Sequence, residues 1–304
     1  MIALHAPQFT NESAAIAHLE ASRWPDGVNC PHCGSVTVTR MGGKTQAGMF
    51  QCNDCRDKFT CRTGTVMERS HIPVHKWLLA IHLISSNKNG VSAHELHRQL
   101  GITYKSSWFL AHRIREAMDT RNSGAMGGGS TDPVQVDETY YGNTSKRAKG
   151  YKRGHKNKAS IVALVEPKTG RASAFHVKSA NATTVQKLVR TYVHRKSVLV
   201  TDESSLYKKL GHEFSDHQTV NHNRAEYVNK AGYSTNNVEN FFLQFKRGMR
   251  GTFIHCEEQH VQRYLNEFSF RYSNRSGLGT DDAARAALAL KGIEGKRLTY
   301  RRPN

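Results

Sequence analysis

Four cysteines near the N-terminus have the spacing of metal ligands. Two CxxC pairs, Cys30 with Cys33 and Cys52 with Cys55, are separated by 18 residues. Two such turns can supply four thiolates to one tetrahedral zinc ion. Because protein would fill all four positions, the predicted ion is structural and leaves no place for water or substrate.

Other roles of the cysteines fit part of the same pattern. Inert thiols or a redox pair also produce a CxxC pattern, but two pairs at this distance favour zinc. His32 and Cys61 lie nearby, so a different fourth ligand stays open. Phe50 and Phe59 flank the second pair and could form a small core around the metal. Cys61 and Cys256 are otherwise expected to be small, non-ligating residues.

A second group of reactive side chains stands where apolar runs end in acids. The run VQVDE ends in Asp137 and Glu138, and the run VLVTD ends in Asp202. If the runs are neighbouring strands, Asp137 and Asp202 lie side by side, with Asp137 turned away from Glu138. Paired carboxylates repel unless a cation neutralises them, and magnesium prefers oxygen ligands. Each acid alone could instead cap a turn or face solvent.

The segment STNNVENFFLQFKRG offers a third acid for this site. Glu239 lies near the start of a helix predicted from about Asn236, and Lys246 follows two turns later on the same face. A carboxylate for metal and a cation for phosphate suit phosphodiester chemistry. Asn236 with Glu239 three residues later is also close to a capping box, so a structural role explains the same residues.

The order of predicted elements decides whether these acids can meet. Strands are predicted at 134–140, 159–165 and 172–177, then a helix at 181–193, a strand at 198–202, a short helix at 205–211, a strand at 218–222 and the helix from about 236. This order places the acids on the first strand, the fourth strand and the last helix.

Before these strands, the sequence is mainly helical. A short helix is predicted at 10–22, and the pattern from 71 to 118 has the form of helix, Gly101-containing turn and helix. Its predicted buried stripe comprises Leu96, Leu100, Trp108, Ile114 and Met118. The second helix opens with Tyr104, Lys105, Ser106 and Ser107, which could contact DNA as a recognition helix does. An ordinary helical hairpin with a solvated polar face is the alternative.

The charge balance indicates a polyanionic partner. Lys and Arg outnumber Asp and Glu by 44 to 25, which gives a net charge of +19. A dense basic run, SKRAKGYKRGHKN, follows the first strand and is predicted to contact the DNA backbone, although such runs are often only solvated surface. Its candidate residues are Lys146, Arg147, Lys149, Lys152 and Arg153. No apolar run approaches the roughly 20 residues of a membrane span, and no signal peptide is recognised, so a cytoplasmic protein is expected.

Composition divides the chain into five parts. They are an N-terminal helix and cysteine module at 1–70, a helix-turn-helix module at 71–120, a Gly-rich linker at 121–133, a domain at 134–275 that carries the acids, and a basic C-terminal tail at 276–304. Its last stretch, KGIEGKRLTYRRPN at 291–304, is expected to be loosely ordered.

With these motifs identified, the chain resembles bacterial insertion-sequence transposases of the ISXO-like type. The matching segments are RWPDGVNCPHCGS, FQCNDCRDKFTCRTGTVMERSHIPVHKW, the helical pair at 92–118, VQVDETYYGN, VLVTDESSLYKKL and NNVENFFLQFKRGMRG. The resemblance implies a zinc ribbon and helix-turn-helix joined to a DDE-type core. That core has a ribonuclease-H-like α/β fold, in which a mixed sheet is flanked by helices.

The resemblance also implies a mechanism. Asp137 and Asp202 match the two aspartates of the family, and the third position is Glu239, with Asn236 as the alternative and Lys246 as the basic residue. Two magnesium or manganese ions would support a nick at the element end and joining of the freed 3′-hydroxyl to target DNA. The implied partners are double-stranded DNA at the terminal repeats and target, and a second copy of the chain. The implied location is the nucleoid.

Two other functions fit parts of the same pattern. A DNA-binding regulator with a degenerate core would bind DNA without metal-dependent cleavage. A structure-selective nuclease on the same fold would cut DNA without joining it, and a fold alone does not distinguish these activities. The zinc ribbon and helix-turn-helix in front of the core favour the transposase.

Overall fold

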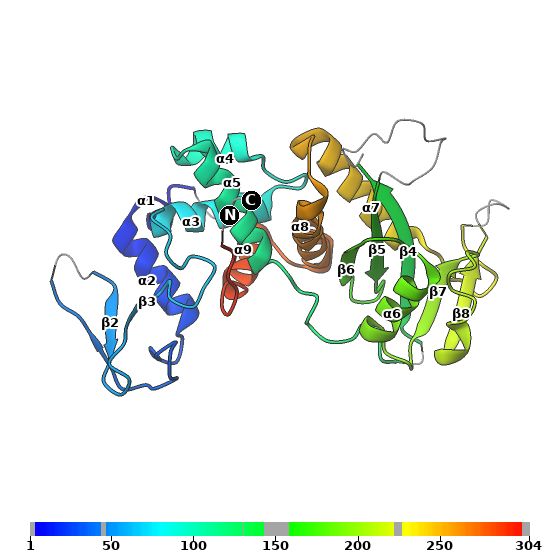
Figure 1. Ribbon diagram of the computed structural model, residues 1–304, viewed down its shortest axis with the longest axis horizontal. Helices are drawn as coiled ribbons and strands as arrows, with labels where there is room; N and C mark the ends of the chain where they lie inside the picture. The colour runs from blue at the N-terminus through cyan, green and yellow to red at the C-terminus, as the bar shows by residue number, and fades with distance from the viewer. Residues whose placement is uncertain (1–3, 44–46, 130, 143–157, 222–226, 300–304) are drawn as a thin grey trace. The chain divides into compact units, whose positions relative to one another are not determined.

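The computed structural model describes residues 4–43, 47–129, 131–142, 158–221 and 227–299. Contacts divide the chain into two units, Met1–Met118 with Asp281–Asn304, and Asp119–Thr280. Figure 1 labels most of the helices and strands of both. Within the described ranges, no helix combines the length and apolar character needed to cross a bilayer.

The first unit contains the cysteine module and most of the helices before the linker. Its elements are α1 (Pro7–Thr10), α2 (Glu12–Arg23), β1 (Val38–Arg40), β2 (Met49–Cys52), β3 (Lys58–Thr60), α3 (Val74–Ser86), α4 (Ala93–Leu100), α5 (Tyr104–Ala117) and α9 (Asp282–Lys291). The predicted N-terminal helix is confirmed as α2, where the Asn11 side chain accepts a hydrogen bond from the backbone N–H of Ala14 at 3.0 Å.

The cysteine module is built on a small antiparallel sheet in the order β1-β2-β3. The buried rings of Phe50 and Phe59 stack with centroids 5.5 Å apart, and Trp24 contacts both rings edge-on. The predicted aromatic core beside the second cysteine pair is therefore confirmed. Such a core is small, which is why a metal is needed to hold modules of this size.

The predicted helix–turn–helix arrangement is confirmed by α4 and α5. The Ser92 hydroxyl caps α4, and Thr103 caps α5 by accepting from the backbone N–H of Ser106. Gly101 ends α4 with φ of 58°, a left-handed conformation that favours glycine. Of the predicted buried stripe, the fully buried members are Leu96, Leu100, Ile114 and Met118, whereas Trp108 is only half-buried.

The segment assigned to the basic C-terminal tail contains a helix that was not predicted. Residues 282–291 form α9, and Asp281 caps this helix by accepting from the N–H of Ala284 at 2.7 Å. Arg285 donates to the carbonyl oxygen of Ser85 in α3 at 3.0 Å, within the first unit. The helix forms because the alanine-rich segment DAARAALALK has high helix propensity and a buried side.

A mixed sheet in the order β6-β5-β4-β7-β8 forms the centre of the second unit (Figure 1). The strands are β4 (Pro133–Tyr141), β5 (Ala159–Val165), β6 (Ala172–Val177), β7 (Val198–Asp202) and β8 (Asp216–Val220). The first three strands pair antiparallel, whereas β7 lies parallel to β4 and to β8. The parallel pairing of β4 with β7 needs a crossover, which includes α6 (Ala182–Tyr192). This is the predicted ribonuclease-H-like α/β fold.

Helices cover both faces of this sheet because its central strands are apolar on both sides. Every residue of β5 is buried. On one face, α6 packs against side chains that include Val136 and Leu164. On the other face, α7 (Asn236–Gly248) and α8 (Val261–Ser273) pack against Ile161 and Ala163.

Two predictions for the second unit need correction. Residues 205–211 do not form the predicted short helix but a series of turns followed by a 3-10 helix at Gly211–Glu213. Two side chains of this segment, Tyr207 and Leu210, are fully buried against the α6 face, so tertiary packing overrides its local helix propensity. The last strand begins at Asp216 rather than at 218.

Candidate functional site

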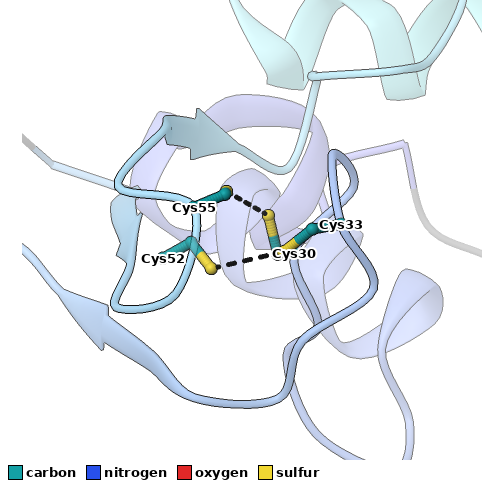
Figure 2. Close-up of side chains that lie close together, drawn as sticks. All are labelled: Cys30, Cys33, Cys52 and Cys55. Atoms are coloured by element: carbon teal, nitrogen blue, oxygen red, sulfur yellow. Dashed lines mark hydrogen bonds between the residues drawn. The ribbon is translucent and has the colours of Figure 1, made fainter.

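Four cysteine side chains converge in the first unit (Figure 2). The Sγ atoms of Cys30 and Cys55 are 3.7 Å apart, and those of Cys33 and Cys52 are 3.6 Å apart. All four sulfur atoms lie within 4.8 Å of one another. One pair comes from the turn before β1, and the other from the end of β2 and the turn that follows.

The geometry and chemistry of this cluster fit zinc. A regular tetrahedron with Zn–S bonds of about 2.3 Å has sulfur–sulfur edges of about 3.8 Å. Backbone N–H groups of Cys55 and then Asp54 lower the pKa of the Cys52 thiol to about 7, although burial opposes this shift. The nearby Cys61 is buried and is not part of the group.

Asp137 lies in the middle of β4, and Asp202 is the last residue of β7, the parallel neighbour of β4 in the second unit. The pairing of the two strands ends at Gln135 with Val200, two residues before each aspartate, and the charge of Asp202 acts on Asp137. Asp137 pairs with Ala163 on the other side, and Ala163 belongs to the core that α7 and α8 cover. Alternation along each strand therefore puts both carboxylates on the α7 face.

The surroundings of Asp137 disfavour its ionised form. Burial, together with the charges of Glu138, Asp202 and Glu239, raises the pKa of this carboxyl to about 7. The backbone N–H of Glu138, which donates to Asp137 Oδ1 at 2.8 Å, acts in the opposite direction. A bound cation would relieve the repulsion that otherwise favours a proton here.

Helix α7 brings an acid and a base toward the same place. Glu239 lies in its first turn and Lys246 in its last. The charge of Glu239 raises the pKa of Asp137, and the charge of Asp137 in turn acts on the pKa of Lys246. Burial and the charge of Arg250 lower the pKa of Lys246, whereas Asp137 raises it. The Lys246 Nζ also lies 6.0 Å from the ring centroid of Phe242. The two inner strands and this helix thus bring four charged side chains, Asp137, Asp202, Glu239 and Lys246, to one face of the sheet.

The start of α7 differs from the predicted capping box. Thr235, not Asn236, is the N-cap residue, and the Thr235 side chain makes no capping hydrogen bond to the helix. The Thr235 hydroxyl instead donates to Glu239 Oε1 at 2.7 Å. Asn236 is the first helical residue and is exposed.

The acids are neighbours without being gathered as the cysteines are. Among the described residues, only the four cysteines bring three or more metal-ligating atoms within 4.8 Å of one another. Asp202 Oδ1 accepts from the backbone N–H of Ser204 at 3.0 Å, and Glu239 accepts from Thr235. Local hydrogen bonds therefore hold the carboxylates of this site, including Asp137, in separate positions.

Two polar residues beside the acids were not anticipated from the sequence. Tyr207 is fully buried, and its hydroxyl donates to Glu138 Oε2 at 2.5 Å on the opposite face of β4. Burial, together with the charge of Glu138, raises the pKa of Tyr207 well above its usual value. Gln135 is buried on the Asp137 face and contacts the start of α7. Both pairings join residues 69 or more positions apart, so no local pattern could have revealed them.

The predicted DNA-contacting residues have different accessibilities. At the start of α5, Tyr104 and Lys105 are exposed, and the Ser106 hydroxyl accepts from Thr103 Oγ1 at 2.9 Å. Ser107 is fully buried and donates to the carbonyl oxygen of Thr103 at 3.1 Å, so its side chain is not exposed for the predicted contact in this conformation. Candidates outside the described residues are Lys146, Arg147, Lys149, Lys152 and Arg153.

Comparison with known proteins connects both sites to one family. Residues 129–273 match the ISXO2-like transposase domain, and residues 10–58 match the transposase zinc-ribbon domain. The chain is 27% identical over 235 residues to an uncharacterized protein in transposable element ISH50 of Halobacterium salinarum, covering 73% of this chain and 78% of the relative.

Two solved structures are also similar to parts of the chain. A chain of the simian T-cell lymphotropic virus intasome in complex with PP2A regulatory subunit B56 gamma is 14% identical, with a TM-score of 0.29, and the match covers 57% of this chain and 63% of that chain. A chain of the Mos1 strand transfer complex is 10% identical, with a TM-score of 0.20, and the match covers 61% and 72% of the two chains.

The two domain matches lie in the same order as the four-cysteine cluster and the acid-bearing sheet, and together they cover more than half of the chain. The zinc-ribbon match contains all four cysteines, and the ISXO2-like transposase match contains Asp137, Asp202 and Glu239. The chain belongs to the ISXO2-like family of insertion-sequence transposases.

Proposed function

We propose that this transposase nicks and joins DNA by DDE-type, divalent-metal-dependent phosphoryl transfer, with Asp137 and Asp202 as the first two metal ligands. One observation carries the proposal: the pairing of β4 with β7 ends two residues before Asp137 and Asp202, and the charge of Asp202 acts on Asp137 on the face that α7 covers. Burial and then the charges of Glu138, Asp202 and Glu239 raise the pKa of Asp137, and a cation would offset this cost of ionisation.

Glu239 is the proposed third ligand. Its charge already acts on Asp137 across the site. To bind metal, its carboxylate would exchange the Thr235 hydroxyl for the cation. Asn236, one helical turn earlier, is the alternative third ligand, because its amide oxygen is also a hard donor.

The proposed cofactor is a pair of magnesium or manganese ions. When bound, such ions supply activation of the attacking oxygen and stabilisation of the leaving oxygen. Asp137 contributes only as the carboxylate, so metal binding displaces the proton that its surroundings favour. Lys246 faces the same site and would pair with a phosphate oxygen of the scissile strand.

The overall reaction then has two balanced steps. Water attacks the phosphorus atom at the element end, the bond from phosphorus to the 3′-oxygen breaks, and the strand is left with a free 3′-hydroxyl. That hydroxyl attacks a phosphorus atom of target DNA, loses its proton, and displaces the 3′-oxygen of the target strand. No covalent bond between protein and DNA is required.

The first unit is proposed to hold the DNA ends. The net charge of +19 of the whole chain favours binding of a polyanion. A fall in DNA affinity at high salt would reveal counterion release. Tyr104 and Lys105 lie exposed at the start of α5, where a recognition helix contacts bases and phosphates. The zinc proposed for the cysteine cluster is structural. Pairing of two element ends would require at least two copies of the chain.

The test uses the full chain, Mn²⁺ or Mg²⁺, and a labelled duplex that ends in the terminal repeat of the element. Wild type is compared with Asp137→Asn and Asp202→Asn. Metal-dependent nicking and joining by wild type alone would support the proposal. Cutting without joining would indicate a nuclease, and equal DNA binding with no cutting by any of the three proteins would indicate a DNA-binding regulator.

A further inference from the structure

A buried glutamine joins the two elements that carry the acids. Gln135 of β4 is 3% exposed and lies two residues before Asp137 on the same face. Its Oε1 accepts from the backbone N–H groups of Asn237 and Val238, each at 3.0 Å. Its Nε2 donates to the carbonyl oxygen of Ser234 at 2.5 Å. One side chain of the sheet thus holds three backbone groups at the start of α7.

These contacts replace a cap that the helix does not supply itself. The first N–H groups of a helix have no partners within the helix. At α7 the N-cap Thr235 makes no side-chain bond to them, because its hydroxyl donates to Glu239 instead. Gln135 supplies the missing acceptor from a strand about 100 positions earlier in the chain. The position of the helix start is therefore fixed to the sheet and not only to its neighbouring residues.

We propose that Gln135 is a positioning residue that sets the separation between Asp137 on β4 and Glu239 on α7. The inference rests on the proposed role of these acids as metal ligands. Gln135 is two residues from Asp137, and its partner Val238 immediately precedes Glu239. The hydrogen bonds thus connect the two ligand-bearing backbones within two residues of each ligand. A second tie, from the Tyr272 hydroxyl to the Asn237 carbonyl oxygen at 3.0 Å, leads to α8 and not to β4.

A purely structural cap would have similar contacts, so the test needs a matched glutamine. Gln262 of α8 provides it within the same unit. Its Oε1 accepts from the backbone N–H of His176 at 2.8 Å, and its Nε2 donates to the carbonyl oxygen of Ala174 at 3.0 Å. Both glutamines therefore tie a helix to a strand, but α8 and β6 carry none of the proposed metal ligands.

The experiment compares full-length wild type, Gln135→Leu, Gln135→Glu and Gln262→Leu. Metal binding is read as the rise in melting temperature on addition of Mn²⁺ and as the Mn²⁺ concentration for half-maximal nicking, with DNA binding measured separately. Gln135→Leu should lower nicking by about 100-fold, the typical result of a misplacement near 1 Å, and should lose most of the Mn²⁺-induced stabilisation. Gln135→Glu keeps an acceptor for both N–H groups but loses the donor to the Ser234 carbonyl oxygen, so it should recover part of both responses.

Gln262→Leu should lower the melting temperature about as much as Gln135→Leu does, while its response to Mn²⁺ stays as in wild type. If Gln135→Leu also keeps the wild-type Mn²⁺ response and nicking rate, Gln135 is only a helix cap and the inference is wrong. Asp137→Asn distinguishes the two levels of failure. If wild type and Asp137→Asn respond identically to Mn²⁺ and neither cuts DNA, the metal site itself is wrong and the role of Gln135 is overturned with it.

Discussion

The cysteine cluster and the acidic site are both suited to metal, but only the cysteines have ligand atoms gathered within 4.8 Å. Each CxxC turn sets two sulfur atoms by local geometry, and one small sheet brings the two turns together. The acids instead come from β4, β7 and α7, and Asp137, Asp202 and Glu239 are each held by a separate hydrogen bond.

The difference follows from the charge of the ligands. Neutral thiols approach closely without a cation, since a sulfur–hydrogen group is a weak donor to another sulfur. Carboxylates repel at the same distance, and burial increases that repulsion. The cysteine cluster is therefore already arranged for its ion, whereas the acidic site has to close around one. The following predictions test this contrast, from the largest expected effect to the smallest.

Removal of zinc should unfold the cysteine module and leave the acidic site unchanged. Zinc binding in small modules is worth about 10–16 kcal/mol, so Cys52→Ser should lose both the metal and the β1-β2-β3 sheet. Zinc content and hydrogen exchange across residues 28–60 would measure this, and Mn²⁺-induced stabilisation would report on the second unit. Cys61→Ser is the control, because this buried cysteine lies outside the cluster and should retain a full equivalent of zinc. Retained zinc in Cys52→Ser would contradict the four-thiolate site.

Loss of either aspartate should abolish nicking with no effect on zinc. Asp137→Asn and Asp202→Asn should each lower the rate by about 1000-fold or more, equivalent to roughly 4 kcal/mol, because the proposed ions lose a charged ligand. Single-turnover cleavage of a labelled element end measures the rate. Asp216→Asn in the neighbouring strand β8 changes an exposed acid and should behave as wild type. Equal activity of all three variants would place catalysis elsewhere.

The third ligand can be identified by comparing two residues of α7. Glu239→Gln should lower nicking by about 100-fold, whereas Asn236→Ala should cost less than about tenfold, if the carboxylate carries the metal. The reverse order would assign the role to Asn236. Thr235→Val removes the hydroxyl that now binds Glu239, and it should not weaken metal binding, because the free carboxylate has one competitor fewer.

The metal-free protein should become less stable as pH rises. The Asp137 carboxyl has a pKa near 3.8 when unfolded and about 7 when folded, so the folded state binds its proton more tightly. Its favourable contribution is fully present below the lower value and is lost as pH rises toward 7. Asp137→Asn should therefore raise the melting temperature at pH 8 by several degrees, at about 2–4 °C per kcal/mol.

Thermal unfolding between pH 5 and pH 8, in the presence of a chelator of divalent cations, would measure this effect. The difference between Asp137→Asn and wild type should be larger at pH 8 than at pH 5. Saturating Mn²⁺ should reduce or reverse this difference in melting temperature, because only the wild-type protein, with Asp137, can bind the ion well. A difference that does not depend on pH would show that repulsion among the acids is not its cause.

Local patterns were sufficient wherever a feature depends on neighbouring residues. The apolar runs ASIVALV and ASAFHV predict strands, and Gly101 predicts the break between two helices, as the structure has them. The turns at 205–211 were not predicted because they depend on burial of Tyr207, whereas the α9 helix was missed although its alanine-rich sequence favours a helix.

For this transposase, the sequence by itself determined the order of most elements, the two cysteine pairs and the strands on which Asp137 and Asp202 lie. Only the tertiary structure decided that β4 and β7 are parallel neighbours whose pairing ends two residues before the two acids. It also decided that Gln135 and Tyr207 meet partners 69 or more positions away. The physical reason is that periodicity fixes which face a side chain occupies, whereas distances between remote segments follow from packing of the whole sheet with its helices.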